Sequence, residues 1–389
     1  MNPSLILISA ALLTWGVGEG MFLIFVPLYL EELGANPLMI GSIFGVFGFM
    51  MMISHVPAGY LSDRIGRRPL LVTAWVTGAV AAWMMALAPS LWLFVAGYLL
   101  YGFTAFVSSP LFSYVTAARG HFSTGRAMTL TSAMFNAGVV VGPFIGGWIG
   151  DRSGLRITFL IAACILLVSV ALILFLKPQP RDEHDDKQSS RDNLLRNKKF
   201  VTFLVIAFIG TFVMYLPQPL TPNYLQNERG ITFTQMGWIG SVGGLGNVAF
   251  NLVLGNFNPR LGFILGQGFV SLAALTFWWG NIPFWYALGY FMFGGYRAAR
   301  LMIFAQVRPF IHQAQMGLAY GLTETVNSLA VILSPLLAGY LYEQGPALIY
   351  PLSFGLILFA IFVSVILIPQ PAQPEHVPLI TAKSPKGDH

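Results

Sequence analysis

The stretch KPQPRDEHDDKQSSRDNLLRNKK, residues 177–199, is the only long polar segment between the apolar runs of this chain. It is rich in charges of both signs and poor in apolar residues, which is typical of a solvated linker. On both sides of it, apolar runs of about 20 residues recur, the length that a helix needs to cross ~30 Å of hydrocarbon. The segment therefore predicts a linker that divides a membrane protein into two parts.

The composition and the apolar runs predict an integral membrane protein with twelve spans. Of the 389 residues, 56% are hydrophobic and only 9% are charged, which leaves too few polar side chains to cover a water-soluble domain of this size. Six runs precede the linker and six follow it. The expected spans are 5–30, 38–61, 70–89, 91–116, 127–150, 156–176, 201–224, 234–256, 261–281, 283–307, 316–342 and 347–368.

Four short motifs recur in the same order on both sides of the linker. They pair residues 27–30 with 222–225, 41–48 with 237–244, 97–103 with 289–295, and 142–147 with 334–339, at offsets of 195, 196, 192 and 192 residues. This agreement of order and spacing indicates a duplicated six-span unit. We therefore expect two pseudo-symmetric six-helix bundles, residues 1–176 and 200–369, and a cytoplasmic tail at 370–389. Transporters with such a repeat bind substrate near the bilayer midplane, between the halves.

The positive charges gather in the segments that would face the cytoplasm if the N-terminus is inside. These segments hold sixteen of the 21 Lys and Arg residues, and only Arg152, Arg156 and Arg229 fall outside. Because Lys and Arg in short loops set membrane orientation, we expect both termini in the cytoplasm and a location in the cell membrane, such as the bacterial inner membrane. The net charge of +6 then needs no nucleic-acid partner. We expect a monomer.

The loop after the second span reads GYLSDRIGRR, residues 59–68. The first glycine allows helices to approach closely, the second allows a tight turn, and the Asp and Arg groups can form charge contacts that break when the halves rock. This spacing resembles the loop signature of the major facilitator superfamily, which implies that Asp63 belongs to a gate. The matching residues are Gly59, Asp63, Arg64, Gly66, Arg67 and Arg68. A role in topology alone would explain the arginines but neither Asp63 nor the glycines.

The corresponding loop of the second half reads GNFNPRLG, residues 255–262. Gly255, Arg260 and Gly262 match the first copy, whereas Pro259 stands where the Asp would fall. The second copy is therefore degenerate, although the family resemblance extends from the first span to the last.

A further motif, GVVVGPFIGG at residues 138–147, lies in the fifth span. It resembles the antiporter motif of exporters in the same superfamily through Gly138, Gly142, Pro143, Gly146 and Gly147. Three of the glycines, four residues apart, form a smooth helix face against which another helix can slide, and the proline weakens the local hydrogen-bond ladder. The motif favours export, although small-residue faces also occur at other helix contacts in membranes.

Proton-coupled exporters of the superfamily typically carry an arginine in the fourth span, four residues before a glycine. This chain has Tyr98 before Gly102. A proton route that depends on that arginine is therefore absent, and proton coupling would have to use other groups.

Five ionisable side chains are expected inside the membrane, where a charge costs several kcal/mol and is a candidate for function. They are Glu19, His55, Arg297, Arg300 and Glu324. At a rise of 1.5 Å per residue, Arg300 and Glu324 both lie about 12 Å from the cytoplasmic edge, which predicts an ion pair. Arg297 lies about 16 Å deep, so we expect it to face a cavity and Glu19.

Polar neighbours extend this candidate site for substrate or protons. Tyr290 shares the helix face of Arg297, and Tyr320 and Asn327 share the face of Glu324. Further polar side chains that could contact a ligand are Tyr215, Gln218, Asn247 and Asn251. Hydrogen bonds between helices are the simpler role for these last four.

The charged groups also have structural explanations. Arg300 could extend toward the cytoplasm on its long side chain, Glu19 could form a structural hydrogen bond, and His55 could pack near the gate. Arg297 is too deep to reach water in this way. The first-half repeat places Ala105 at its position, which argues against a structural need that both halves share.

Together these features predict a secondary transporter of a small organic molecule that works by alternating access, with proton-coupled export favoured. Glu19 or Glu324 would release a proton when substrate binds, and Arg297 would tune the acid or meet an anionic group. The alternatives are an importer or exchanger of an anionic metabolite held by Arg297 and Arg300, and a transporter-like receptor without flux. The sequence shows no metal-ligand cluster, phosphate loop or activated nucleophile, so we expect neither enzyme activity nor a cofactor.

Overall fold

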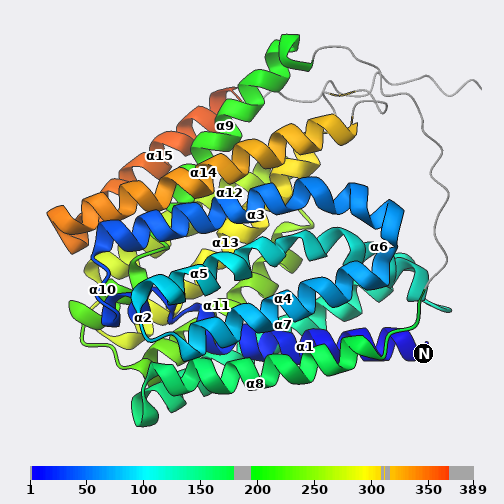
Figure 1. Ribbon diagram of the computed structural model, residues 1–389. Coiled ribbons are helices and arrows are strands. Elements are labelled where there is room, and N and C mark those ends of the chain that lie inside the picture. The colour runs from blue at the N-terminus through cyan, green and yellow to red at the C-terminus, as the bar shows by residue number, and fades with distance from the viewer. Residues whose placement is uncertain (1, 179–193, 308–310, 312–315, 368–389) are drawn as a thin grey trace, which may run out of the picture.

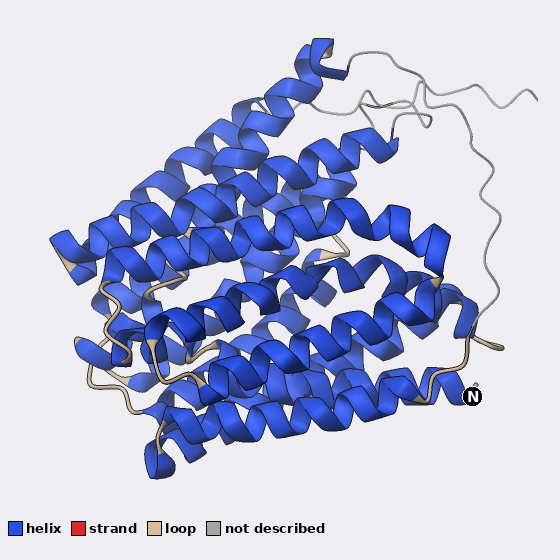
Figure 2. Ribbon diagram, in the orientation of Figure 1, coloured by secondary structure: helices blue, strands red, loops and turns tan. Residues whose placement is uncertain are grey.

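The computed structural model of the chain describes residues 2–178, 194–307, 311 and 316–367, without the side chains of 55–65, 109, 195, 316 and 317. All regular secondary structure in the described residues is helical (Figure 2). The helices lie roughly side by side in one bundle (Figure 1). We call the end that holds the first described residues and the turns at 66 and 119–123 the proximal end. The opposite end, with the turns at 33–36, 154 and 228–232, is the distal end.

Before the linker, the long helices run back and forth between these two ends. They are α1 (Pro3–Leu23), α2 (Val26–Glu32), α3 (Pro37–Ile65), α4 (Arg67–Leu87), α5 (Leu91–Phe103), the 3-10 helix η1 (Thr104–Val107), α6 (Ser108–Ala118), α7 (Thr124–Ser153) and α8 (Leu155–Leu174). After the linker come the short η2 (Leu194–Arg196), α9 (Lys198–Tyr215), α10 (Thr221–Asn227), α11 (Phe233–Leu254), α12 (Pro259–Trp279), α13 (Pro283–Val307), α14 (Met316–Gln344), η5 (Pro346–Leu348) and α15 (Ile349–Leu367).

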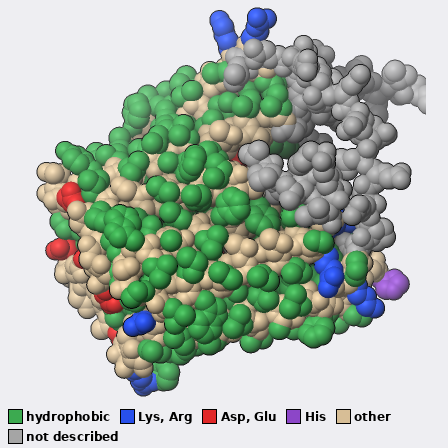
Figure 3. All heavy atoms as spheres, in the orientation of Figure 1, with side chains coloured by type: hydrophobic (Ala, Val, Ile, Leu, Met, Phe, Trp, Pro, Cys, Tyr) green, Lys and Arg blue, Asp and Glu red, His purple; other side chains and the backbone are tan. Residues whose placement is uncertain are grey.

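The helices account for the twelve expected spans. Ten are long and apolar enough to cross a membrane, or up to 11 if the bent pair Leu91–Val107 and Pro110–Ala118 counts as one span. The twelfth is α13, whose 25 residues are long enough to cross but include two arginines that lower its apolar character. Hydrophobic side chains cover the visible sides of the bundle, whereas Asp and Glu side chains appear at the distal end (Figure 3).

Three spans expected to be continuous are broken, and for two of them the sequence supplies the reason. The first span bends between α1 and α2, where Pro27 lies in the first turn of α2. The seventh breaks between α9 and α10, where Pro222 occupies the same place in α10. Proline lacks a backbone N–H and clashes with the preceding turn, so the chain cannot continue as one regular helix. In the fourth span, η1 separates α5 from α6.

The helix contacts confirm the internal repeat. In the first half, α1 packs on α7 and α8, α4 packs on α5 and α8, and α3 packs on α5. In the second half, α9 packs on α14 and α15, α12 packs on α13 and α15, and α11 packs on α13. The main contacts between the halves, α7 with α11 and α14 with α3, are also counterparts. The two halves therefore meet around an approximate twofold axis.

The loop comparison between the halves needs a correction at Arg260. The expected alignment paired it with Arg64, but its guanidinium donates to the carbonyl of Val365 at the end of α15. Arg68 does the same to the carbonyl of Leu174 at the end of α8, at 3.0 Å. Four loop residues separate α11 from α12, whereas a single residue separates α3 from α4. Arg260 is therefore the second residue of its helix, as Arg68 is, and occupies the equivalent position.

Candidate substrate site

A cavity of about 300 Å³ lies between the two halves and is lined by residues of both. Its walls are mostly hydrophobic and aromatic. Each half contributes one charged side chain to the lining, Glu19 of α1 and Arg297 of α13. The aromatic lining consists of Phe44, Phe135, Tyr215, Tyr290, Phe293 and Tyr296. A concave, largely apolar site with few polar groups is typical of a site for a small organic molecule.

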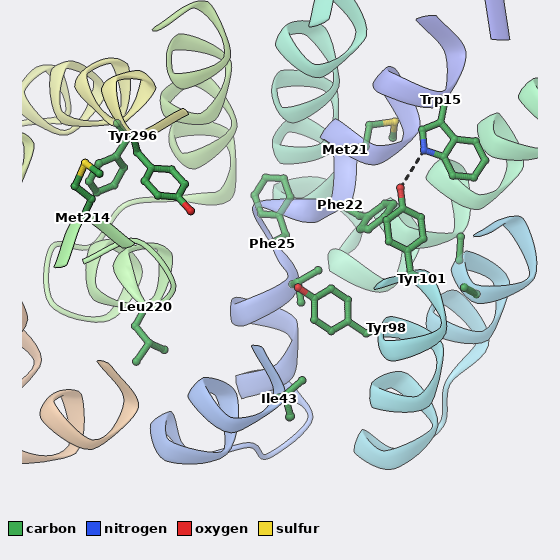
Figure 4. Packing of buried hydrophobic residues seen from close by; sticks show 14 of the residues in the cluster. Trp15, Met21, Phe22, Phe25, Ile43, Tyr98, Tyr101, Met214, Leu220 and Tyr296 are labelled. Carbon is green, nitrogen blue, oxygen red and sulfur yellow. Dashed lines mark hydrogen bonds between the residues drawn. The ribbon is translucent and has the colours of Figure 1, made fainter. Parts of the chain in front are cut away.

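The Glu19 carboxylate is held by two donors from its own half. The hydroxyl of Tyr101 donates to Glu19 Oε2 at 2.7 Å, and the ring nitrogen of Trp15 donates to the same oxygen at 3.1 Å. Trp15 Nε1 also donates to the Tyr101 hydroxyl, at 3.1 Å; Figure 4 shows this bond, with Phe22 packed beside Tyr101. Trp15 and Tyr101 thus fix the carboxylate at the wall of the cavity that Arg297 also lines.

Two adjacent glycines orient Arg297 toward the cavity. Gly294 lies against the backbone of Gly246 in α11, and Gly295 lies against that of Gly266 in α12. Neither place has room for a side chain, so α13 fits tightly between its two neighbours. The remaining face of α13 points inward and carries Arg297.

Phe293 and Tyr290 continue this inward face one and two turns away from Arg297. The Tyr290 ring packs edge-on against Phe277 and Phe293, with centroids 5.6 Å away in each case. Nearer Arg297, the rings of Tyr215 and Tyr296 lie 5.5 Å apart. Tyr296 and Met214 belong to the second half and lie across the view from Tyr98 and Trp15 (Figure 4). Arg297 therefore shares the cavity wall with several aromatic side chains.

Arg300 and Glu324 form an ion pair between α13 and α14. Their side chains are 34% and 33% exposed, so the pair is only partly buried. The pair lies beside the cavity and outside the set of residues that line it. The ion pair predicted from the equal depth of these two residues is therefore present.

The five residues of the glycine motif divide between two partners. Gly138, Gly142 and Gly146 lie against the backbone of α1, in the same half. Gly147 lies against α11 of the other half, as does Pro143. The three-glycine face is thus a tight contact within one bundle, whereas Gly147 contacts the other half and Pro143 contacts both α11 and Gly20 of α1.

At the distal end, the halves cross at two equivalent points. On one side Gly147 of α7 meets Gly237 of α11, and on the other Gly339 of α14 meets Gly41 of α3. A side chain at any of the four would collide with backbone atoms. The offsets of 192 and 196 residues show that the duplication produced both crossings.

Several hydrogen bonds join the two halves at the distal end. The side-chain amide of Asn223 donates to the carbonyl of Pro27 at 3.1 Å and to the Glu31 carboxylate. Asn227 donates to the same carboxylate at 2.8 Å. The distal end is therefore closed, while the partly exposed ion pair of α13 and α14 lies in the proximal half of the bundle.

A search against family models matches the Major Facilitator Superfamily at residues 8–295 and again at 203–387. The chain belongs to this superfamily. It is accordingly a multi-pass membrane transporter and not an enzyme, and it binds a small-molecule substrate while embedded in a lipid bilayer. The match confirms the family expected from GYLSDRIGRR.

Similar superfamily members cover nearly the whole chain. The tetracycline resistance protein of class B from Escherichia coli is 24% identical over 399 residues, 95% of this chain and 98% of its own. The class C protein from the same species is 28% identical over 368 residues, 88% of this chain and 91% of its own. A crystal structure of a mutant of the nucleoside transporter NupG superposes with a TM-score of 0.80 at 15% identity, covering 94% of this chain and 100% of that one.

Other residues expected at the site lie elsewhere. Asn327 is buried and accepts a hydrogen bond from Thr211 at 2.9 Å, within the second half. Tyr320 lies beside Phe304 and is 37% exposed. Neither lines the cavity, nor does Asn251. Tyr215, Gln218 and Asn247 do line it.

The loop motif is described only in part. The side chains of His55, Asp63 and Arg64, and the surroundings of Gly59, lie outside the described part of the chain. Gly66 has a φ of +88°, the left-handed conformation that glycine adopts without strain, as expected for a tight turn. Arg67 lines a second hollow at the proximal end together with Arg119.

The sequence did not single out Trp15 and Tyr101 as functional residues. Tyr101 lies in GYLLYGF, one of the repeated motifs, and Trp15 lies one helical turn before Glu19. That spacing places Trp15 on the Glu19 face, which was the available signal. Among the described residues, no group of three His, Cys, Asp or Glu side chains could hold a metal ion.

Arg300→Met is expected to lower the free energy of unfolding by about 1–2 kcal/mol, because it leaves the Glu324 carboxylate partly buried without its partner. The loss stays below the 3–5 kcal/mol typical of fully buried pairs, since both groups are only partly buried. Thermal unfolding in detergent measures the effect. The double variant Arg300→Met, Glu324→Met should lose less than the single one, and additive losses would show that the ion pair contributes nothing.

Proposed function

We propose that this transporter exports a small, largely apolar organic solute in exchange for protons. The observation that carries the proposal is the presence of Glu19 and Arg297, one from each half, in the lining of the same hydrophobic cavity. Glu19 is the only carboxylate among the residues that line this cavity. It is also placed where both halves can act on it, because its hydrogen-bond donors come from the first half and its positive neighbour comes from the second.

The local geometry gives Glu19 two states that differ in charge. In the deprotonated state the carboxylate accepts both hydrogen bonds and offsets the charge of Arg297. In the protonated state the positive charge of Arg297 is left without compensation. A solute that donates a hydrogen bond or brings positive charge to the Glu19 carboxylate stabilises the deprotonated form, so its entry releases a proton and its departure allows reprotonation.

The direction of transport rests on relatives and on charge. Both relatives described above are named as tetracycline resistance proteins, and the GVVVGPFIGG motif resembles that of exporters. We place the proximal end, which holds most Lys and Arg residues, in the cytoplasm. The closed distal end then corresponds to the inward-facing state, which binds solute from the cell interior. We expect the protein to act as a monomer in the bacterial inner membrane.

The mechanism we propose is alternating access between the two six-helix halves, residues 1–176 and 200–369. The halves touch mainly along α7 with α11 and α3 with α14, so rotation about the cavity opens one end while closing the other. The glycine crossings allow the distal ends to meet without interposed side chains.

The test is a thermal-shift screen of organic solutes at two pH values, followed by counterflow and proton-flux measurements in vesicles with each stabilising compound. Loading solute into vesicles that contain the protein should move protons in the direction opposite to the solute. Transport that ignores a pH gradient, and also persists unchanged in Glu19→Gln and in Glu324→Gln, would exclude proton coupling.

A further inference from the structure

Two carboxylates at the distal end each bind the first turn of a helix in the other half. Asp151, near the end of α7, accepts hydrogen bonds from the amides of Phe233 at 2.9 Å and Thr234 at 2.7 Å, where α11 begins. Glu343, near the end of α14, accepts one from the amide of Leu38 at 3.3 Å, where α3 begins. We call these two contacts the distal caps.

The internal repeat relates the two distal caps. Asp151 and Glu343 are 192 residues apart, the offset of the repeated motifs in α7 and α14. Leu38 and Phe233 are 195 residues apart, close to the offset of the motifs in α3 and α11. The acid side chain differs in length between the halves, yet its acceptor oxygen reaches the same turn of the partner helix. Two related positions thus form the same contact.

The amides that Asp151 binds are those that α11 cannot satisfy by itself. Thr232 caps the helix through its hydroxyl, which accepts from the amide of Gln235, while the Gln235 side chain accepts from the amide of Thr232. The amides of Phe233 and Thr234 lie between them, and the first turn of a helix has no carbonyl partner to offer. The other half of the protein supplies that partner.

The amide groups available at the start of α3 explain in the same way why Glu343 accepts a single hydrogen bond. Pro37, the first residue of α3, has no amide hydrogen to donate. The side chain of Asn36 accepts from the amide of Met39 at 2.8 Å. The amide of Leu38 is therefore the one left over in this turn, and Glu343 binds it.

We propose that Asp151 and Glu343 are the positioning residues that hold the distal end closed. Carboxylates at helix N-termini are stabilising because the aligned peptide dipoles and free amides are positive there. Both caps join one half to the other, so both must break when the distal end opens. The freed amides then form hydrogen bonds with water instead. Their contribution belongs to the closed state alone and sets the balance between the inward- and outward-facing states.

This inference rests on the proposed alternating access, and its test needs no substrate. Spin-label distances would be measured on the full chain in lipid nanodiscs, with Cys164→Ser to remove the native thiol. One label pair, at Ser90→Cys and Glu228→Cys, spans the halves at the distal end, and a second, at His121→Cys and Asn256→Cys, spans them at the proximal end.

Asp151→Ala should raise the fraction of molecules with a long distal distance by about fivefold, and Glu343→Ala by about threefold, in line with one or two lost hydrogen bonds to an exposed charged group. The proximal distance should shorten in the same molecules. Asp151→Glu, which keeps the carboxylate, should restore most of the closed population. Glu32→Ala, which removes an exposed distal carboxylate with no contact to the other half among the described residues, should change neither distance.

Unchanged distances in the double variant Asp151→Ala, Glu343→Ala would overturn the proposal. So would broadening of both distances together, because that pattern indicates a general loss of packing and not a shift between two states. Failure of the proposed function gives a different result. In that case the distances shift as expected, while transport remains independent of pH.

Discussion

Glu19→Gln is expected to abolish solute export driven by a pH gradient and to weaken solute binding, because the uncharged amide resembles the protonated acid. The amide keeps an oxygen that can accept from Tyr101 and Trp15, so the cavity wall keeps its shape. It cannot bind or release a proton, however, and uphill export should fall by at least about 100-fold, as when a positioned proton donor is removed from a reaction. Fluorescent pH readings and solute uptake in the same vesicles measure the first effect, and the thermal shift caused by solute measures the second.

Glu324→Gln is the matched control for this prediction. It makes the same chemical change in a carboxyl group that pairs with Arg300 outside the cavity lining. Proton-driven export should survive there at a reduced rate, because Glu19 still exchanges protons. If Glu324→Gln abolishes export and Glu19→Gln does not, the coupling carboxylate is the one in the ion pair.

Gly147→Leu is expected to leave the protein folded and to reduce transport by at least about 100-fold, because overpacking against fixed backbone is costly. The new side chain would meet the backbone of Phe233 and Gly237, which belong to the other half. The distal end could then no longer close, and the protein would stay outward-facing. Transport assays in vesicles, together with the distal spin-label distance, check both parts of this expectation.

The neighbouring Gly146→Leu provides the comparison, since the substitution is the same and only the partner differs. Gly146 lies against the backbone of Met21 in its own half, so a leucine there should separate α1 from α7 and reduce the amount of folded protein. Size-exclusion chromatography distinguishes the two variants. Equal loss of folded protein in both would mean that the contact between the halves is as essential to folding as the contacts within them.

The repeat and the helix count followed from the sequence because they depend on local properties. A helix needs about 20 apolar residues to cross the membrane, and that requirement is visible without knowing what the helix touches. The breaks after Leu23 and Tyr215 were missed, although Pro27 and Pro222 signal them. Apolar character continues through both prolines, and hydropathy alone therefore predicts one helix where the structure has two.

The candidate site could be predicted only in part. The high cost of charge in a membrane singled out Glu19 and Arg297, which line the cavity, and Arg300 and Glu324, which form an ion pair outside its lining. The depth of Arg300 and Glu324 was enough to pair them, since adjacent spans leave few choices. Tyr101 was not found, because tyrosine is common in such spans and nothing along the chain marks the one that points at a carboxylate.

Sequence alone was enough to establish a duplicated membrane transporter of the Major Facilitator Superfamily with charged groups buried at mid-depth. The folded arrangement was needed to show which of those groups share a cavity, which glycines face the other half, and that Asp151 and Glu343 bind helices far away in the chain. This difference arises because apolar length and charge depth belong to one helix at a time. Contacts between the halves depend instead on the rotation of each helix about its axis, which is set by packing against neighbours that lie far along the chain.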